Sequence, residues 1–420
     1  MQKTTRKVNP LMFLQIYYLS LTTCFFASVV SVTATSWTFL LAAMAALLSW
    51  QPCFWRRIIE NKAALSFWIF GALYIIGIFY STSTSAQIFR DVQKQHWLLI
   101  TPFFIAALTE EKWRLRMINA FVAAMTLTLI LSYSEVVTNI SLPWKNSYLE
   151  LSCVFMNHIV QSFALCLTAV IVGYRLLFLK IESMIEKIFY VALWIAIAFN
   201  IFAINEGRTG YLLFVLLMTY LFFQRFRTRG FLIALGVSAG VMFVAFNISP
   251  AFHQRVVAAY EDVNQYRQDH AKAKTTPVGQ RVEMIDIAHQ MMTERPWFGY
   301  GTGGIRTALP QVVSQQDRVF NPLLDYVESI YVNMVLQFGV VGLCVLFLMA
   351  MLQWIVSFRL PEQYRILIQS VLMMIFIGGV ANGFLVSFPI THIYALFSAL
   401  CFSALTIGKR HTQNTAKMRT

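Results

Sequence analysis

Residues 329–356 read SIYVNMVLQFGVVGLCVLFLMAMLQWIV and contain no charged side chain. About 20 apolar residues in a helix cross a hydrocarbon core of about 30 Å, and this stretch is longer than that. A bilayer offers no water to backbone N–H and C=O groups, so an apolar segment that spans it must be helical. The stretch therefore predicts a transmembrane helix rather than a buried helix of a soluble domain.

Similar apolar runs make up most of the chain. Of the 420 residues, 58% are hydrophobic and 12% are charged, whereas a soluble domain carries about 25% charged residues. The runs predict an all-α polytopic membrane protein with about twelve transmembrane helices. We expect these helices at residues 11–31, 37–53, 64–80, 97–109, 117–137, 158–178, 188–205, 209–224, 230–248, 329–356, 366–387 and 390–407.

The distribution of basic residues supports this count. If the N-terminus is cytoplasmic, twenty-one of the 33 basic residues fall in inside segments and four in short outside segments. An excess of Lys and Arg marks the cytoplasmic side of a membrane protein, although long loops do not follow the rule. The pattern places the long polar stretch between the ninth and tenth helices, residues 249–327, outside the cytoplasm.

The net charge of +14 does not indicate a nucleic-acid partner, because the basic residues flank apolar runs and form no stripe interleaved with aromatics. The six cysteines lie in or beside apolar runs, without metal-ligand or disulfide spacing, and we interpret them as packing residues. The basic N-terminal residues and the following apolar run could imitate a signal peptide. The run is long enough to span, which favours an uncleaved first helix.

Ionisable residues at outer helix ends are the candidates for function, since a membrane protein tolerates them only where they are paired, hydrated or functional. Arg208 lies in the polar break Asn205-Glu206-Gly207-Arg208-Thr209-Gly210, at the predicted start of the eighth helix. Its charge adds to the exposed N–H groups of that helix start, which favours an anion site. The alternative is an interfacial loop in which Arg208 pairs with Glu206 or a lipid headgroup.

Arg281 follows Pro277-Val278-Gly279-Gln280 and opens a predicted amphipathic helix. Its planar guanidinium group suits phosphate recognition. The expected apolar face consists of Val282, Ile285, Ala288 and Met292. The alternative is a surface arginine on an interfacial helix.

Three other segments stand out at the same predicted side. Glu328 precedes the tenth helix, where it is either a helix cap or a general base. Arg90 and Lys94, with His96, lie just before the fourth apolar run and are either functional or interfacial. The glycine-rich segment 294–304 lacks P-loop spacing, and we interpret it as a helix stop at Pro296 followed by a flexible turn.

The sequence lacks a nucleotide-binding motif, an HExxH or GxSxG motif and an Asp-rich metal pattern. We therefore expect no metal and no cofactor. An outward-facing enzyme also has no ATP, which favours an activated lipid-linked donor.

Taken in order, the motifs resemble those of the O-antigen ligase/polymerase superfamily of bacterial membrane glycosyltransferases. The matching segments cover most of the second half of the chain, while the first half matches in topology alone. They are Glu206-Gly207-Arg208-Thr209-Gly210, Gly279-Gln280-Arg281-Val282, Arg295-Pro296-Trp297-Phe298-Gly299-Tyr300-Gly301, Glu328-Ser329-Ile330-Tyr331-Val332 and Gln337-Phe338-Gly339-Val340-Val341-Gly342-Leu343.

The resemblance implies an inner-membrane enzyme with cytoplasmic termini and a periplasmic active site. It would transfer a glycan from undecaprenyl diphosphate to a hydroxyl of lipid A-core, without metal. Arg208 and Arg281 would bind the diphosphate, with help from Arg90 and Lys94, and Tyr331 would also contact substrate. The implied organisation is helices one to nine (1–248), a periplasmic loop with amphipathic helices (249–327), helices ten to twelve (328–408) and a cytoplasmic tail (409–420).

One position departs from the family pattern. The family has histidine before the tenth helix as the base that activates the acceptor, and this chain has Glu328. A carboxylate is a weaker base than imidazole. Four interpretations stay open: Glu328 replaces the histidine, Asp325 replaces it, the acceptor is different, or the chain has lost activity.

Alternative functions stay open from the sequence. An O-antigen polymerase uses the same donor with a lipid-linked glycan as acceptor, and a protein O-oligosaccharyltransferase uses a protein. A polysaccharide transporter or flippase predicts charged or helix-breaking residues at mid-membrane depth, which are scarce in these runs. Partners expected in every case are membrane lipids.

Overall fold

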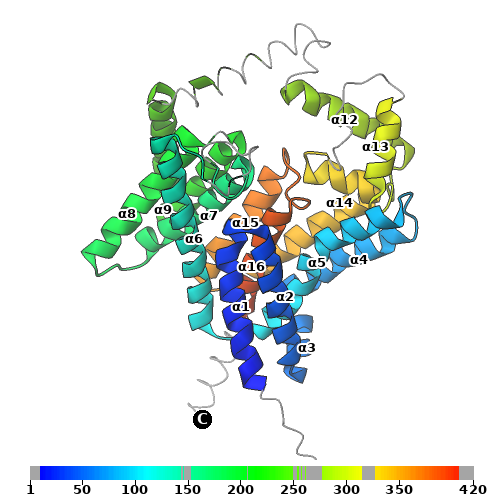
Figure 1. Cartoon of the computed structure of the whole chain (residues 1–420), viewed down its shortest axis with the longest axis horizontal. Coiled ribbons are helices and arrows are strands. Elements are labelled where there is room, and N and C mark those ends of the chain that lie inside the picture. Colours follow the sequence, from blue (N-terminus) through cyan, green and yellow to red (C-terminus); the bar gives the residue numbers. More distant parts are fainter. Residues whose placement is uncertain are drawn as a thin grey trace, which may run out of the picture.

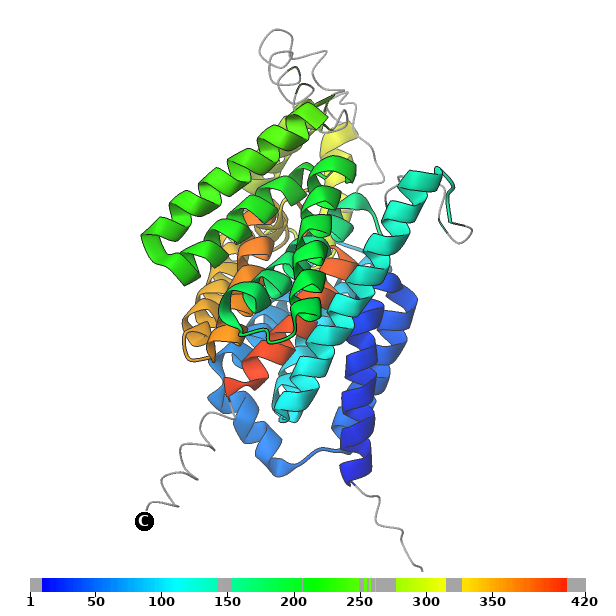
Figure 2. The ribbon, with the colours of Figure 1, turned by 90° about the vertical axis from the view of Figure 1, so that its left-hand side faces the viewer.

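The computed structural model describes residues 10–142, 145, 153–205, 207–248, 253–254, 257, 261, 277–314 and 327–405, and all regular elements in these ranges are helices. Figures 1 and 2 show them as one bundle, with α12 and α13 at one end and α3 at the other. The helices are α1 (Pro10–Val30), α2 (Val32–Leu48), α3 (Pro52–Glu60), α4 (Lys62–Ile78), α5 (Ser85–Ala107), α6 (Glu111–Thr138), α7 (His158–Phe178), α8 (Met184–Phe199) with the π-helical turn η1 (Asn200–Ile204), α9 (Arg208–Ile248), α12 (Pro277–Glu294), α13 (Gly304–Ser314), α14 (Ile330–Ser357), α15 (Glu362–Gly378) and α16 (Phe388–Ser403).

Six helices of the described ranges are long and apolar enough to cross a membrane, or seven if the bent pair α2 and α3 forms one span. The class of all-helical protein with several membrane spans is therefore confirmed. The expected number of twelve is not reached by this measure, and it stays a prediction, as does the side of the membrane on which residues 249–327 lie. The helices α4 and α16 are apolar but shorter than the others.

Several predicted boundaries are wrong: α2 spans residues 32–48 instead of 37–53, α3 was not predicted, α6 begins at Glu111 instead of 117, and two further boundaries differ by about ten residues. The fourth helix was expected at 97–109, but α5 begins at Ser85 because its first turns are polar and an apolar run does not reveal them. The eleventh was expected to reach residue 387, but α15 ends at Gly378, where a second glycine follows and helix propensity falls. The two runs at 209–224 and 230–248 form the two halves of α9, separated by a non-helical residue, Arg227.

The centre of the bundle is formed by α7 and α16. All residues of α16 from Ile390 to Ser403 are buried, and so are all residues of α7 from Val160 to Gly173. Several polar side chains in this interior are paired, since an unpaired polar group in an apolar environment is costly, whereas His392 and Ser398 of α16 are buried without a hydrogen-bond partner among the described residues. Gln353 of α14, for example, donates to Ser66 Oγ of α4 at 3.1 Å and accepts from the hydroxyl of Tyr394 of α16 at 2.7 Å.

Basic residues that were expected inside gather at one end of the bundle. Arg57 of α3 donates to the carbonyl of Ala106 at the end of α5 at 2.9 Å. The fully buried Arg114 of α6 donates to Ser403 Oγ at the end of α16 at 3.3 Å and pairs with Glu111 at 2.8 Å. The starts of α7, α9 and α14 lie at the opposite end, where the functional candidates were expected.

Candidate active site

The connection between α15 and α16, residues 379–387, is the meeting point of the candidate segments. Asn382 is buried in it and donates through Nδ2 to Thr209 Oγ1 and to the carbonyl of Gly378, both at 3.0 Å. Thr209 directly follows Arg208, so this contact fixes the start of α9 against the end of α15. The contact of Asn382 with Thr209 joins segments distant in the sequence, and it was not predicted.

The start of α14 joins the same connection. The backbone N–H of Ile330 donates to the carbonyl of Gly379 at 2.9 Å. Asn333 donates to the carbonyl of Ser329 at 2.7 Å and accepts from the N–H of Val327 at 3.2 Å, which holds the turn around Glu328. Ser329 occupies the N-cap position of α14. Glu328 is thus not the cap, and its half-buried carboxylate lies just outside the helix.

The third candidate segment lies on α5. Gln95 donates to the carbonyl of Leu385 at 3.1 Å, which anchors α5 to the connection. One turn earlier, Asp91 accepts a hydrogen bond from Gln337 of α14 at 2.7 Å and lies 3.8 Å from Lys94 Nζ. Arg90 is exposed on the preceding turn. Arg90 and Lys94 were expected before a helix, whereas both lie within α5; the link through Asp91 was not predicted.

Arg208 is the first residue of α9, as its position after a polar break predicted. The preceding turn is held by Asn205, whose Oδ1 accepts from the N–H of Gly207 at 3.0 Å and whose carbonyl accepts from the hydroxyl of Tyr211 at 3.0 Å. Arg208 itself is half-buried. Glu206, its possible ion-pair partner, lies outside the described residues.

The glycine-rich segment after α12 fills a break in α14. The break is at Gly339, with a φ of 64°, and the N–H groups of Tyr300 and Gly301 donate to the carbonyls of Leu336 and Gln337 at 2.9 and 2.8 Å. The N–H of Thr302 also donates to the carbonyl of Gly77 of α4 at 3.1 Å. The helix stop before Pro296 is confirmed, since α12 ends at Glu294. The prediction of a flexible turn is wrong, because these backbone bonds hold the turn between two helices.

The helix that carries Arg281, α12, packs over the start of α14. Its buried face consists of Met284, Ile287, Ala288 and Met291, which form one apolar cluster with Val327 and Leu336. The predicted face is partly wrong: Ala288 is buried, but Ile285 is 58% exposed. The sequence contains two overlapping apolar stripes, and contact with α14 selects the one that begins at Met284. The backbone places Arg281 and Val282 in the first turns of α12, while the structure does not describe their side chains.

Tyr331 heads an apolar groove between α14 and α15. Its hydroxyl donates to the carbonyl of Phe376 at 2.6 Å, and its ring stacks on Phe347 at 5.7 Å between centroids. The groove has a volume of about 820 Å³ and runs from Tyr331 to Trp354. Its other lining residues are Cys344, Phe347, Leu348, Ala350, Met351, Leu372, Met373, Phe376 and Ile377.

The chemistry of this end of the bundle follows from its residues. Arginine and lysine side chains recognise anionic oxygens, and a half-buried carboxylate can accept a proton. Among the described residues, no group of three or more His, Cys, Asp and Glu side chains could hold a metal ion. The fold and this site define a multi-pass membrane protein with a charged site at one end of its helices.

Residues 191–347 match the family model of the O-antigen ligases, so this part of the chain is similar to that family. The matched segment includes Arg208, Arg281, Glu328 and Tyr331. No curated protein matches the chain.

Proposed function

We propose that the protein transfers a glycan from undecaprenyl diphosphate to a hydroxyl of lipid A-core on the periplasmic face of the inner membrane. The observation that carries this proposal is the convergence of the segments with Arg208, Glu328 and Lys94 on the connection between α15 and α16. These segments lie far apart in the sequence. Where they meet, Arg208 and Lys94 supply positive charge for a diphosphate, and Glu328 supplies a carboxylate for the acceptor hydroxyl.

In this reaction the acceptor oxygen attacks the anomeric carbon of the glycan as the bond from that carbon to the diphosphate oxygen breaks. Glu328 accepts the proton of the acceptor hydroxyl. Arg208 and Arg281 bind the diphosphate and stabilise the negative charge that builds on it as it leaves. Attack opposite to the leaving group inverts the anomeric centre.

The basic segment of α5 assists the two arginines. Asp91 restricts Lys94 through their ion pair and is itself held by Gln337. A cation restrained in this way loses less conformational freedom on binding the diphosphate. Arg90, which is exposed, is suited to the outer part of the donor.

The apolar groove headed by Tyr331 is suited to the polyprenyl tail of the donor. It opens beside the turn that carries Glu328, and its lining is almost entirely apolar. A tail in this groove would place the diphosphate at the end of α15, next to the start of α9. In this arrangement, the residues that bind the polyprenyl tail are distinct from those that bind the diphosphate.

A reconstituted reaction tests the proposal. The protein in liposomes is given glycan-loaded undecaprenyl diphosphate and lipid A-core, and the glycosylated core is measured. We expect product with wild type and at least about 100-fold less with Arg208→Ala, because the developing charge loses a main partner. Arg116→Ala serves as control, because Arg116 lies near the start of α6, at the end of the bundle away from the candidate site. If the lipid-linked glycan is extended but none is transferred to core, the protein is a polymerase and not a ligase. If neither acceptor reacts, both assignments are refuted.

A further inference from the structure

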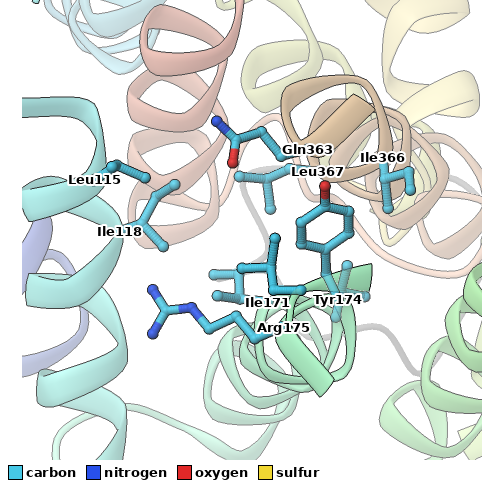
Figure 3. A pocket seen from close by; sticks show the side chains of 10 residues that line it. Leu115, Ile118, Ile171, Tyr174, Arg175, Gln363, Ile366 and Leu367 are labelled. Carbon is cyan, nitrogen blue, oxygen red and sulfur yellow. The ribbon is translucent and has the colours of Figure 1, made fainter. Parts of the chain in front are cut away.

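A second site lies at the end of the bundle opposite to the candidate active site. Two adjoining cavities of about 440 and 590 Å³ between α6, α7 and α8 share the residues Asn119, Arg175 and Tyr190. A smaller cavity adjoins them on the side of α15, and Figure 3 shows Arg175 extending from α7 towards the helix that carries Leu115 and Ile118. None of these residues contributes to the transfer reaction.

The first cavity is an apolar track. Beyond Asn119 it is lined along one face of α6 by Val122, Ala123, Thr126, Leu127 and Ile130, and by Phe189 of α8. Asn119 and Ile130 are separated by about 16 Å along the helix axis, which is about half the thickness of a hydrocarbon core. Beyond Ile130, the hydroxyl of Tyr133 of α6 donates to the carbonyl of Ala196 of α8 at 2.7 Å, which joins the two helices.

The track faces lipid rather than protein. The outer face of α8 exposes large apolar side chains, among them Ile188, Ile195 and Phe199. An apolar helix face of this kind lies against acyl chains in a membrane protein. Ile130 and Phe189, which line the track, are themselves 60% and 47% exposed, so the track is open to the bilayer.

Arg175 supplies a charge at the head of this track. It donates to the hydroxyl of Tyr190 at 2.7 Å and to Asn119 Oδ1, and its guanidinium group lies 5.3 Å from the centre of the Tyr190 ring. These partners are neutral, and an arginine has five N–H donors. Within the described part of the chain its positive charge has no carboxylate in ion-pair distance.

The acidic residues of the second cavity do not neutralise Arg175. Glu182 lies 3.9 Å from Lys180, and both side chains are exposed. Glu186 lies in the first turn of α8, where a carboxylate is stabilised by the helix dipole, and its N–H is capped by Ser183. The head of the track thus carries a guanidinium group whose N–H donors are not all used by Tyr190 and Asn119.

We propose that this groove binds a phospholipid with an anionic headgroup. The phosphate receives hydrogen bonds from Arg175, and one acyl chain lies along the track between α6 and α8. Planar arginine groups bind phosphate in a forked arrangement, and basic pockets between transmembrane helices select anionic headgroups. The bound lipid would fill the gap between α8 and α6.

Native mass spectrometry of the full chain tests this proposal. The detergent-solubilised protein is titrated with phosphatidylglycerol and, separately, with phosphatidylethanolamine. We expect one phosphatidylglycerol to bind more tightly than phosphatidylethanolamine, and Arg175→Gln to weaken it about tenfold, the effect of losing a hydrogen bond to a charged group. Arg116→Gln is the matched control, since Arg116 belongs to the same end of α6 but stacks on Trp113 outside the groove.

A second variant tests the apolar track. Ala123 lines it and is exposed, so Ala123→Trp fills the track without disturbing the core. We expect this variant to reduce binding of both lipids. Equal binding of the two lipids by wild type, unchanged phosphatidylglycerol binding in Arg175→Gln, or an equal loss in Arg116→Gln would each overturn the proposal. These readouts do not involve glycan transfer and stand apart from the proposed reaction.

Discussion

Arg208 owes its position to its neighbours. Asn205 holds the turn before it, and Asn382 holds Thr209 after it. An arginine at a helix start adds its charge to free backbone N–H groups, and both favour an anion. Both the location and the charge of Arg208 therefore favour anion binding. A lysine at this position would keep the charge but not the shape of the guanidinium group.

Arg208→Lys keeps the charge and removes the forked donor group. We expect glycan transfer to fall about 10- to 100-fold, since a hydrogen bond to a charged group contributes roughly 1.5–3 kcal/mol. The rate of core glycosylation in liposomes measures this. Activity equal to wild type would mean that the position needs only a positive charge.

Glu328 stands where the resemblance implies a histidine. We expect Glu328→Gln, which keeps the shape and loses the proton acceptor, to lower transfer at least about 100-fold, the usual contribution of a general base. Glu328→His should restore much of that loss. The two variants are compared by rate at saturating donor. Full activity of Glu328→Gln would assign the base to another group.

At the scale of residues the sequence predicted the charged candidates but not their supports. Arg208 and Glu328 stand out because polar residues interrupt apolar runs at these points. Asp91, Gln337 and Asn382 act through contacts with helices distant in the sequence, and no local pattern reveals such a partner. The roles of Arg208, Arg281, Glu328, Arg90, Lys94 and Tyr331 stay predictions.

At the scale of elements the central feature is the break in α14. Gly339 adopts a φ of 64°, and a Cβ there would lie 2.2 Å from the backbone of Trp297. The break lets the segment 296–301 pair with α14 and ties α12 to the bundle. The sequence predicted one uninterrupted helix from 329 to 356, because a glycine within an apolar run is compatible with continuous helix.

Gly339→Ala should destabilise the protein by at least about 1–2 kcal/mol, the cost of a positive-φ conformation that is essentially restricted to glycine. Thermal unfolding in detergent measures the effect as a lower Tm. Gly240→Ala is the matched control, because a Cβ at Gly240 has no neighbour within 4 Å. Equal Tm values for both variants would show that the break does not need glycine.

At the scale of the whole molecule, the periodicity of apolar runs predicted most helices within a few residues, since burial in lipid demands such runs. Polar starts, as in α5, and the choice between two apolar faces, as in α12, depend on tertiary contacts and could not be predicted. The charge pattern agrees with the grouping of Arg57 and Arg114 at one end of the bundle. Which end faces the periplasm is a prediction of that pattern.

Labelling of cysteines tests this orientation. Cys53 is exposed on α3, and Thr293 is exposed near the end of α12. In spheroplasts, a membrane-impermeant maleimide should label Thr293→Cys at once, whereas Cys53 should react only after the membrane is opened. The opposite pattern would reverse the orientation and move the site to the cytoplasm.

The most direct test of the central claim is the lipopolysaccharide ladder of a strain that lacks this protein. The account predicts that deletion removes the whole ladder above the core while lipid-linked glycan accumulates, and that wild type, but not Arg208→Ala, restores it. An unchanged ladder in the deletion strain, or a single repeat unit still attached to the core, would contradict transfer to lipid A-core by this protein.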